Sequence, residues 1–296
     1  MNFLNALPGA VAQGMIWGIM AIGVYITYKL LDIADLTVDG SICTGACVCT
    51  MLVISGVNIW IAMLAAFIAG MLTGFLTGIF HTFMGIPAIL AGILTQLILW
   101  SVNLKILGSK ANQGLSARTY HVVITQLDRG KSILILVAFV VVIIALLYWF
   151  FGTELGCSIR ATGCNLHMSH AQGINTNVNK ILGLVLSNGI VALSGALLCQ
   201  YQGFTDINMG RGAIVIGLAA VIIGEALFGR ISSNFAVRLA VVVGGGIIYY
   251  IVYQTVIWIG LDTDLLKMLS ALVVAIFLAG PYWKSHYFTK PKKGGK

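Results

Sequence analysis

Between Gly40 and Leu104 the chain contains not one Asp, Glu, Lys or Arg. The whole sequence is 59% hydrophobic and 9% charged, whereas a soluble domain carries about 25% charged residues. A soluble fold could not bury such a long uncharged stretch, and the apolar runs are continuous rather than alternating as in a barrel. The sequence therefore predicts a bundle of membrane-spanning helices.

Apolar runs of spanning length predict an all-α polytopic membrane protein with about nine transmembrane helices, within a range of about eight to ten. The expected spans are Gly9–Leu31, Val38–Ser55, Ile59–Phe80, Ile86–Leu107, Ser132–Phe151, Lys180–Gln202, Gly212–Phe228, Ala236–Gly260 and Leu265–Trp283. The second and seventh are short and polar at their starts, which indicates broken or partly re-entrant helices. Residues 1–283 would form one transmembrane domain, with no cleavable signal peptide, and residues 284–296 a basic tail.

The distribution of basic residues predicts the orientation. The tail carries Lys284, Lys290, Lys292, Lys293 and Lys296. Because basic segments stay in the cytoplasm, the tail and the loop 152–179 are expected inside and the N-terminus outside. The loop Gly108–Lys131 then falls outside, although it is basic. The tail explains much of the positive charge, so no nucleic-acid partner is expected.

The six cysteines lie in expected spans or in the cytoplasmic loop, so no disulfide is predicted. Cys43 and Cys47 share a helical face, but zinc would need further ligands, and packing is the better interpretation. His167 and His170 also lack a third ligand nearby. We therefore expect no metal site.

Spaced glycines, alanines and aspartates indicate an inverted internal repeat. Gly18, Ala21 and Asp35 recur at a constant offset as Gly189, Ala192 and Asp206, and Gly40 and Gly45 recur, one residue later, as Gly212 and Gly217. Under the nine-span count the two copies start on opposite sides of the membrane, as in many transporters. Chance is the alternative, because glycine and alanine are abundant here.

A polar island from Glu154 to Asn175 separates two long apolar spans. It contains the pattern Gly156-x3-Arg160-Ala-x-Gly163-x-Asn165-x5-Ala171-x-Gly173-Ile-Asn175, followed by Leu193-Ser-Gly-Ala196, Asp206-Ile-Asn-Met-Gly210 and Ala220-Val-Ile-Ile-Gly224. This order resembles the permeases of the branched-chain amino acid and ribose class of bacterial ABC importers. One departure is Leu166, which follows Asn165 where the family often has proline; His167 and His170 are also unusual.

A second match, Leu31-Asp-Ile-Ala-Asp35-Leu-Thr-Val-Asp39-Gly40-Ser-x4-Gly45-Ala46, resembles permeases that work with tryptophan/tyrosine-type substrate-binding proteins. The resemblance, which covers about half the chain, implies the membrane-spanning subunit of an importer in the bacterial cytoplasmic (inner or plasma) membrane. It implies two ATPase subunits that bind ATP and Mg, an extracytoplasmic substrate-binding lipoprotein, and a small solute such as an aromatic amino acid. The pore would be completed by a second permease copy, as a homodimer, or by a close relative.

No catalytic set is visible in the sequence, and Gly294-Gly295-Lys296 lacks the spacing of a phosphate-binding loop. The chain is therefore not expected to be an enzyme or to bind a cofactor itself. Three alternatives stay open at this point: a sugar or nucleoside as cargo, a secondary transporter driven by ions, and, less favoured, a membrane-embedded enzyme. Binding of surrounding lipid follows from the apolar surface.

The resemblance and the amphipathic pattern of Arg160 to Asn175 predict a coupling helix that docks on the ATPase. The candidate coupling residues are Arg160, Gly163, Asn165, His167, His170, Ala171, Gly173 and Asn175. The alternative is a solvated interfacial loop.

Charged and glycine residues at the starts of the second and seventh spans predict a translocation route, because charges at membrane depth tend to face a cavity, water or a partner. The candidates are Asp35, Asp39, Gly40, Gly45, Asp206, Asn208, Gly212 and Gly217, with Arg211 beside them. Helix capping by Asp39 and Asn208 is an equal alternative.

Glu225 is the acid placed well inside a predicted span, and we expect it to pair with a basic residue near the coupling loop rather than to bind solute. The outer loop Gly108–Lys131 carries Arg118, Tyr120 and His121. It could dock the substrate-binding protein, although such loops are more often simply solvated.

Overall fold

The computed structural model describes residues 3–228 and 234–258, together with the isolated positions 268, 271, 272, 275 and 279. The described chain is mainly helical. Its helices are α1 (Phe3–Tyr25), the π-helical segment η1 (Ile26–Leu30), α2 (Val38–Ile54), α3 (Ile59–Thr82), α4 (Ala88–Ile106), α5 (Arg129–Gly152), α6 (Glu154–Cys164), α7 (Leu166–Ala171), α8 (Thr176–Gln202), α9 (Ala213–Phe228) and α10 (Phe235–Trp258).

Within the described residues, six helical segments are long and apolar enough to cross a membrane: α1 with η1, α3, α4, α5, α8 and α10. The helices α2 and α9 are apolar but shorter, in agreement with the prediction for the second and seventh spans. The all-α polytopic class is thus supported. The ninth expected span, Leu265–Trp283, lies outside the continuously described ranges, so the count of nine stays a prediction.

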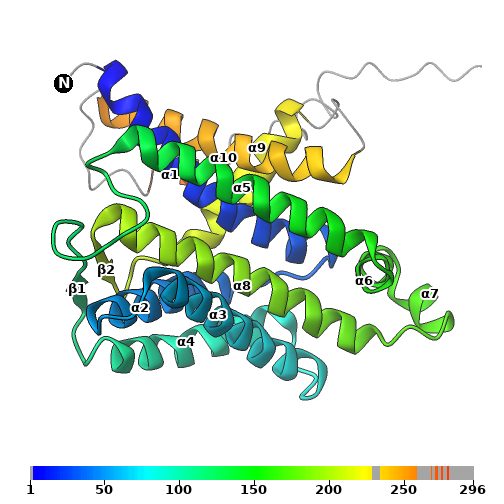
Figure 1. Ribbon diagram of the computed structural model, residues 1–296. Helices are drawn as coiled ribbons and strands as arrows, with labels where there is room; N and C mark the ends of the chain where they lie inside the picture. Colours follow the sequence, from blue (N-terminus) through cyan, green and yellow to red (C-terminus); the bar gives the residue numbers. More distant parts are fainter. Residues whose placement is uncertain are drawn as a thin grey trace, which may run out of the picture.

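The helices run between two distinct ends of the molecule. The short helices α6 and α7 form one end, and a small sheet lies at the other (Figure 1). In this sheet β1 (Asn112–Gly114) pairs antiparallel with β2 (Phe204–Asp206), with Gln113 opposite Thr205. A pairing of three residues across ninety positions leaves no periodic pattern in the sequence, which is why the all-α prediction missed it.

Helix α8 occupies the centre of the bundle and packs against α1, α2 and α3. Small residues allow the backbones to approach closely. A Cβ atom at Gly45 of α2 would collide with the carbonyl oxygen of Ala192, and one at Gly195 of α8 would collide with that of Ile42. Glycine is therefore required at these crossings by packing rather than by backbone conformation.

Helix α2 begins inside the bundle rather than at its surface. Near its start, Ser41 Oγ donates a hydrogen bond of 2.6 Å to Asn188 Oδ1, which lies halfway along α8. Near its end, Thr50 and Thr205 of β2 share a hydrogen bond of 2.6 Å between their hydroxyl groups. The helix therefore runs from the middle of the bundle to the sheet end.

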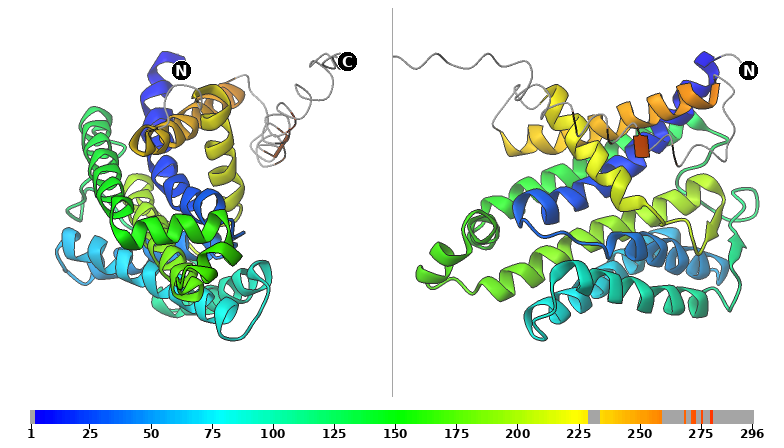
Figure 2. Two further views of the ribbon diagram at one scale, coloured as in Figure 1. Left: turned by 90° about the vertical axis from the view of Figure 1, so that its right-hand side faces the viewer. Right: turned by 180° about the vertical axis from the view of Figure 1, so that it is seen from behind.

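Helix α9 begins beside the start of α2 and runs the other way. Its first residues contact Asp39 of α2, and Glu225 in its last turn pairs with Lys29 of η1, close to α6. Viewed from behind, α9 starts near the middle of the molecule and passes across α1 and α10 (Figure 2). The two short helices thus diverge from one point towards opposite ends.

Candidate functional site

Helix α6 is fixed to the bundle by Arg160. Its Nη2 atom donates a hydrogen bond of 2.7 Å to the carbonyl oxygen of Phe151 at the end of α5. Its guanidinium carbon lies 5.8 Å from the ring centroid of Phe235 on α10, within cation–π range. The side chain is half-buried and faces the bundle, so its position favours anchoring of α6 over direct contact with a partner.

Gly163 brings α6 onto the π-helical segment. A Cβ atom at this position would collide with the carbonyl oxygen of Leu30 in η1. Segments of π-helix are rare and often occur at functional sites. A movement of α6 towards η1 would therefore displace η1, because the two backbones are in contact.

The expected single helix from Arg160 to Asn175 is wrong, because the chain forms two helices there. Asn165 adopts an extended backbone (φ −156°, ψ 105°), ends α6, and accepts a hydrogen bond from Met168 N at the start of α7. Asn175 caps α8 in the same way, through Val178 N. Gly173 has a φ of +78°, a conformation that favours glycine. These three candidates shape the loop.

The remaining coupling candidates, His167, His170 and Ala171, are exposed on α7. Two apolar side chains that were not among the sequence-based candidates lie exposed at the same end: Leu155 of α6, 56% exposed, and Met168 of α7, 62% exposed. The sequence feature that could have indicated them is their apolar character within the polar island from Glu154 to Asn175. We call these five residues the α7 surface; it combines exposed imidazole and apolar groups suited to docking.

Asp39 joins the two short helices. Its Oδ2 accepts a hydrogen bond from Gly212 N and its Oδ1 one from Ile214 N, both 2.9 Å long. Asp39 itself lies in the first turn of α2, so one carboxylate faces the positive ends of two helix dipoles. The predicted capping role is thus real but serves α9 rather than α2. We call this arrangement the α2–α9 joint.

The predicted cap at Asn208 is wrong. Its side chain is exposed, and its backbone N–H donates to Asp206 Oδ1 at 2.7 Å within the turn that follows β2. Asp206 belongs to the small sheet, at the sheet end, where its Cα lies opposite that of Asn112. These two candidates therefore lie apart from the α2–α9 joint and shape the segment that leads into it.

Asp35 lies in the loop before α2 and is 2% exposed. Its carboxylate accepts hydrogen bonds from Thr37 N (2.9 Å) and from Asn188 Nδ2 on α8 (2.7 Å). Asn188 also accepts, through its Oδ1, a hydrogen bond from the hydroxyl group of Ser41. The same hydroxyl group is hydrogen-bonded to that of Thr73 on α3. Buried and fully engaged, Asp35 ties the loop to α8 rather than presenting a free carboxylate.

Three of the other glycine candidates are packing positions, and the fourth is a turn position. Gly45 contacts α8, and a Cβ atom at Gly217 of α9 would lie 2.8 Å from Val24 Cγ2 of α1. A Cβ atom at Gly40 would lie 2.8 Å from Leu99 Cδ1 of α4. Gly212 has a φ of +84°, as the turn into α9 requires.

Three candidates, Asp39, Gly40 and the adjoining Arg211, line one pocket of about 240 Å³ together with α4. Helix α4 contributes Gln96, Trp100 and Asn103. These three residues were not among the sequence-based candidates, because α4 has the composition of an ordinary apolar span and its pocket-facing side is decided by packing.

Glu225 does have a basic partner: its Oε2 lies 3.0 Å from Lys29 Nζ. Both side chains are more than a third exposed, at 37% and 46%. Since η1 contacts α6, this ion pair connects the last turn of α9 to the neighbourhood of α6. A role of Glu225 in coupling remains a prediction.

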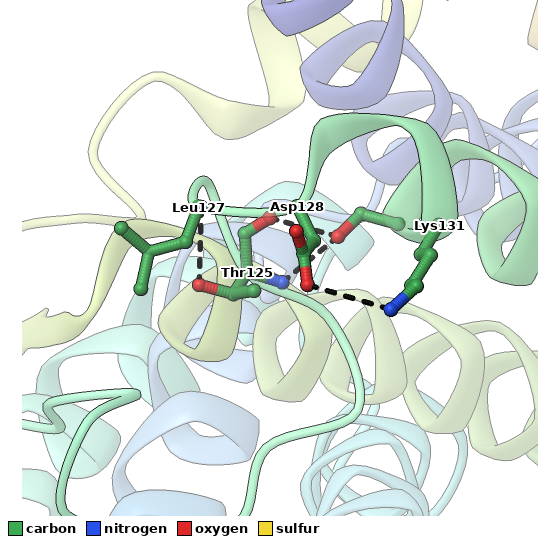
Figure 3. A network of polar contacts seen from close by, with 5 residues as sticks. Thr125, Leu127, Asp128 and Lys131 are labelled. Carbon is green, nitrogen blue, oxygen red and sulfur yellow. Dashed lines mark hydrogen bonds and ion pairs between the residues drawn. The ribbon is translucent and has the colours of Figure 1, made fainter.

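The loop Gly108–Lys131 lies at the sheet end, opposite α6 and α7 (Figure 1). Its exit into α5 is held by hydrogen bonds between Thr125 and Ser132, of 2.9 and 2.8 Å (Figure 3). Lys131 and Asp128 form an exposed contact of 3.8 Å beside them. Arg118 and His121 are exposed and Tyr120 is partly buried, so the loop presents a polar surface.

The described residues contain no group of three or more His, Cys, Asp or Glu side chains placed to hold a metal ion. Cys43 and Cys47 are buried, with their Sγ atoms 3.7 Å apart, and they pack against Leu107. Both cysteines therefore pack in the core.

Residues 7–278 match the family model described as branched-chain amino acid transport system / permease component. A tyrosine transport system permease protein of Clostridioides difficile (strain R20291) is 37% identical over 93% of this chain and 91% of its own length. An uncharacterised protein of Rickettsia prowazekii (strain Madrid E) is 34% identical over 93% and 98%.

An autoinducer 2 import system permease protein, LsrC, of Yersinia enterocolitica is 31% identical over 62% of this chain and 51% of its own length. No solved structure matches the chain. The match spans nearly all of the described helices, and the names of the relatives indicate a transport subunit rather than a catalytic enzyme. The chain is a multi-pass membrane protein and belongs to the family of permease components of branched-chain amino acid transport systems.

Proposed function

We propose that this chain is the membrane-spanning subunit of an ATP-binding-cassette importer and forms the translocation pathway for a small solute. The first candidates are amino acids, aromatic ones in particular, since one relative is named for tyrosine transport. An extracytoplasmic binding protein would deliver the solute. The observation that supports this most directly is a continuous contact path from the exposed α7 surface to the α2–α9 joint.

The path has three steps. The anchored helix α6 contacts η1 where Gly163 meets Leu30. The neighbouring Lys29 of η1 pairs with Glu225 in the last turn of α9. The first turn of α9 is bound by Asp39 of α2. A rigid-body movement of α6, imposed by an ATPase, would thus reach the two short helices in the middle of the bundle.

An inverted repeat fits the packing of these helices. Gly45 of α2 packs on Ala192 of α8. Its proposed counterpart, Gly217 of α9, packs on Met20 and Val24 of α1, either side of Ala21, the counterpart of Ala192. The two short helices also run to opposite ends. We include nine spans, with substrate passing at the interface of the two repeats, in the proposal.

The proposed partners follow from the two ends. Two ATPase subunits, which would hold ATP and Mg, bind the α7 surfaces of two permease copies, and the binding protein docks on the loop Gly108–Lys131. The α6–α7 end and the C-terminus would face the cytoplasm of a bacterium, with the sheet end outside the inner membrane.

The test is affinity purification from native membranes in mild detergent, followed by mass spectrometry. The triple variant His167→Glu, Met168→Glu and His170→Glu keeps the caps at Asn165 and Asn175 but adds three charges to the α7 surface. It should lose a stoichiometric phosphate-binding-loop ATPase. The control variant Arg118→Ala, at the other end, should retain the ATPase.

The outcomes separate the alternatives. An ATPase that remains bound to the triple variant would contradict docking on the α7 surface. A chain that purifies alone and supports uptake dependent on an ion gradient would instead be a secondary transporter. If the ATPase is present but the binding protein that purifies with it prefers a sugar or nucleoside, the machinery stands and the proposed cargo is wrong.

A further inference from the structure

The pocket beside the α2–α9 joint lies in the half of the bundle nearer the sheet end. It is bounded by the first half of α2, the second half of α4, and the segment that precedes α9. Its volume is about 240 Å³. Asp39 and Arg211 bring two charged groups to a wall that is otherwise largely apolar, and charges at membrane depth mark solute pathways.

Asn103 supplies an unsatisfied hydrogen-bond acceptor at this pocket. The residue is 1% exposed, and among the described residues its Oδ1 is the one buried side-chain oxygen or nitrogen without a hydrogen-bond partner. A buried oxygen without a partner is unfavourable, because it has lost its hydrogen bonds to water and gained none in return. The presence of this unpaired oxygen is explained if a bound ligand supplies the missing hydrogen-bond donor.

Arg211 supplies a cation that the protein does not neutralise. No carboxylate of the described chain lies within ion-pair distance of its guanidinium group, and its side chain is exposed. The nearby carboxylate of Asp39 is engaged by Gly212 N and Ile214 N instead. Arg211 is therefore available for an anionic group, and its forked donors suit a carboxylate.

Trp100 completes the site with a flat apolar surface that is 45% exposed. Leu97, one turn earlier on α4, is 64% exposed and lines the same pocket. An apolar or aromatic side chain of a ligand can lie against these two residues, since aromatic rings favour offset stacking. The pocket thus offers three kinds of contact: acceptor, cation and apolar wall.

We propose that this pocket is a solute-binding site for an α-amino acid. The carboxylate of the amino acid pairs with Arg211, its ammonium group donates to Asn103 Oδ1 and faces the Asp39 carboxylate, and its side chain lies against Trp100. This inference rests on the proposed function and adds the place in the bundle where the solute binds and the residues that recognise it. A sugar would leave the guanidinium group of Arg211 without its anion, so a zwitterion fits the charges better.

The test measures equilibrium binding of radiolabelled L-tyrosine and L-leucine to the purified permease–ATPase complex in lipid nanodiscs, without binding protein. The variant Asn103→Leu replaces the amide by an apolar group of similar size, and Arg211→Gln removes the cation. Each should weaken binding by about 10- to 100-fold, the equivalent of one hydrogen bond to a charged group. Ser101→Ala and Lys105→Gln, on α4 outside the pocket, are the matched controls.

Two tyrosine analogues assign the contacts. Tyramine lacks the carboxylate, so the wild type and Arg211→Gln should bind it equally well. The compound 3-(4-hydroxyphenyl)propionate lacks the ammonium group, so Asn103→Leu should leave its binding unchanged. Asn103→Leu should also keep the thermal stability of the complex, because it removes an unpaired polar atom.

Several results would overturn the site. They are wild-type binding of neither amino acid, binding of D-ribose in their place, or unchanged amino acid binding in both pocket variants. Mass spectrometry of the same preparation shows independently whether the ATPase is present. An absent ATPase would refute the proposed function, whereas a complete complex with unaffected variants would refute the pocket alone.

Discussion

The joint between α2 and α9 predicts a large loss of stability when Asp39 is replaced. In Asp39→Ala, the backbone N–H groups of Gly212 and Ile214 lose the acceptor to which they donate at 2.9 Å. Each hydrogen bond to a charged group contributes about 1.5–3 kcal/mol, so the two together contribute about 3–6 kcal/mol.

The stabilisation by these two hydrogen bonds is partly offset by the free energy needed to remove the carboxylate from water. Asp39 is only partly buried, so we expect a net loss of about 2–4 kcal/mol in the free energy of unfolding. Asp39→Asn keeps one acceptor oxygen of similar placement and should lose about half as much. The graded order, wild type above Asn above Ala, is the signature of the two hydrogen bonds.

The assay is reversible unfolding by sodium dodecyl sulfate in mixed micelles, followed by circular dichroism. Asp128→Ala is the control, because Asp128 is 66% exposed and lies 3.8 Å from Lys131 in a surface contact, worth about 0–1 kcal/mol. If Asp39→Ala and Asp128→Ala lose the same free energy of unfolding, or if Asp39→Asn loses as much as Asp39→Ala, the two hydrogen bonds of Asp39 do not stabilise the joint.

Two further substitutions test the packing and the ion pair. Gly45→Ala should destabilise the bundle by about 1–3 kcal/mol through overpacking against Ala192, whereas Gly244→Ala, where a Cβ atom meets nothing within 4 Å, should not; equal melting temperatures would contradict this. Glu225→Gln should change stability by no more than about 1 kcal/mol, since the pair is partly exposed, yet lower the transport obtained per ATP hydrolysed. Exchanging the charges in the double variant Glu225→Lys with Lys29→Glu should restore that ratio, and a failure to do so would argue against coupling through this pair.

Local sequence patterns predicted the elements that depend on composition alone. Eight of the nine expected spans coincide closely with described helices, because an apolar run of spanning length has few alternatives to a helix in a membrane. The shortness of the second and seventh spans was also visible, because their starts are polar. The exposed position of His167 and His170 followed from their place in a polar island.

Pairings over long sequence distances were not predictable in this way. Asp39 was expected to cap its own helix or to line a route, but its hydrogen bonds go to residues more than 170 positions away. Asn103 was not selected at all, since a single amide in an apolar span has many harmless environments. Arg160 was expected to face a partner, and only the position of Phe151 and Phe235 turns it towards the bundle.

The sequence by itself thus determined the membrane class, the approximate spans, the polar island and the family, because each depends on hydrophobicity or on a contiguous motif. The tertiary structure alone decided which groups meet: the α2–α9 joint, the contact of α6 with η1, and the pocket formed with α4. The physical reason is that hydropathy and capping act over a few neighbouring residues. The partner of a buried polar group, in contrast, is selected by how distant helices pack.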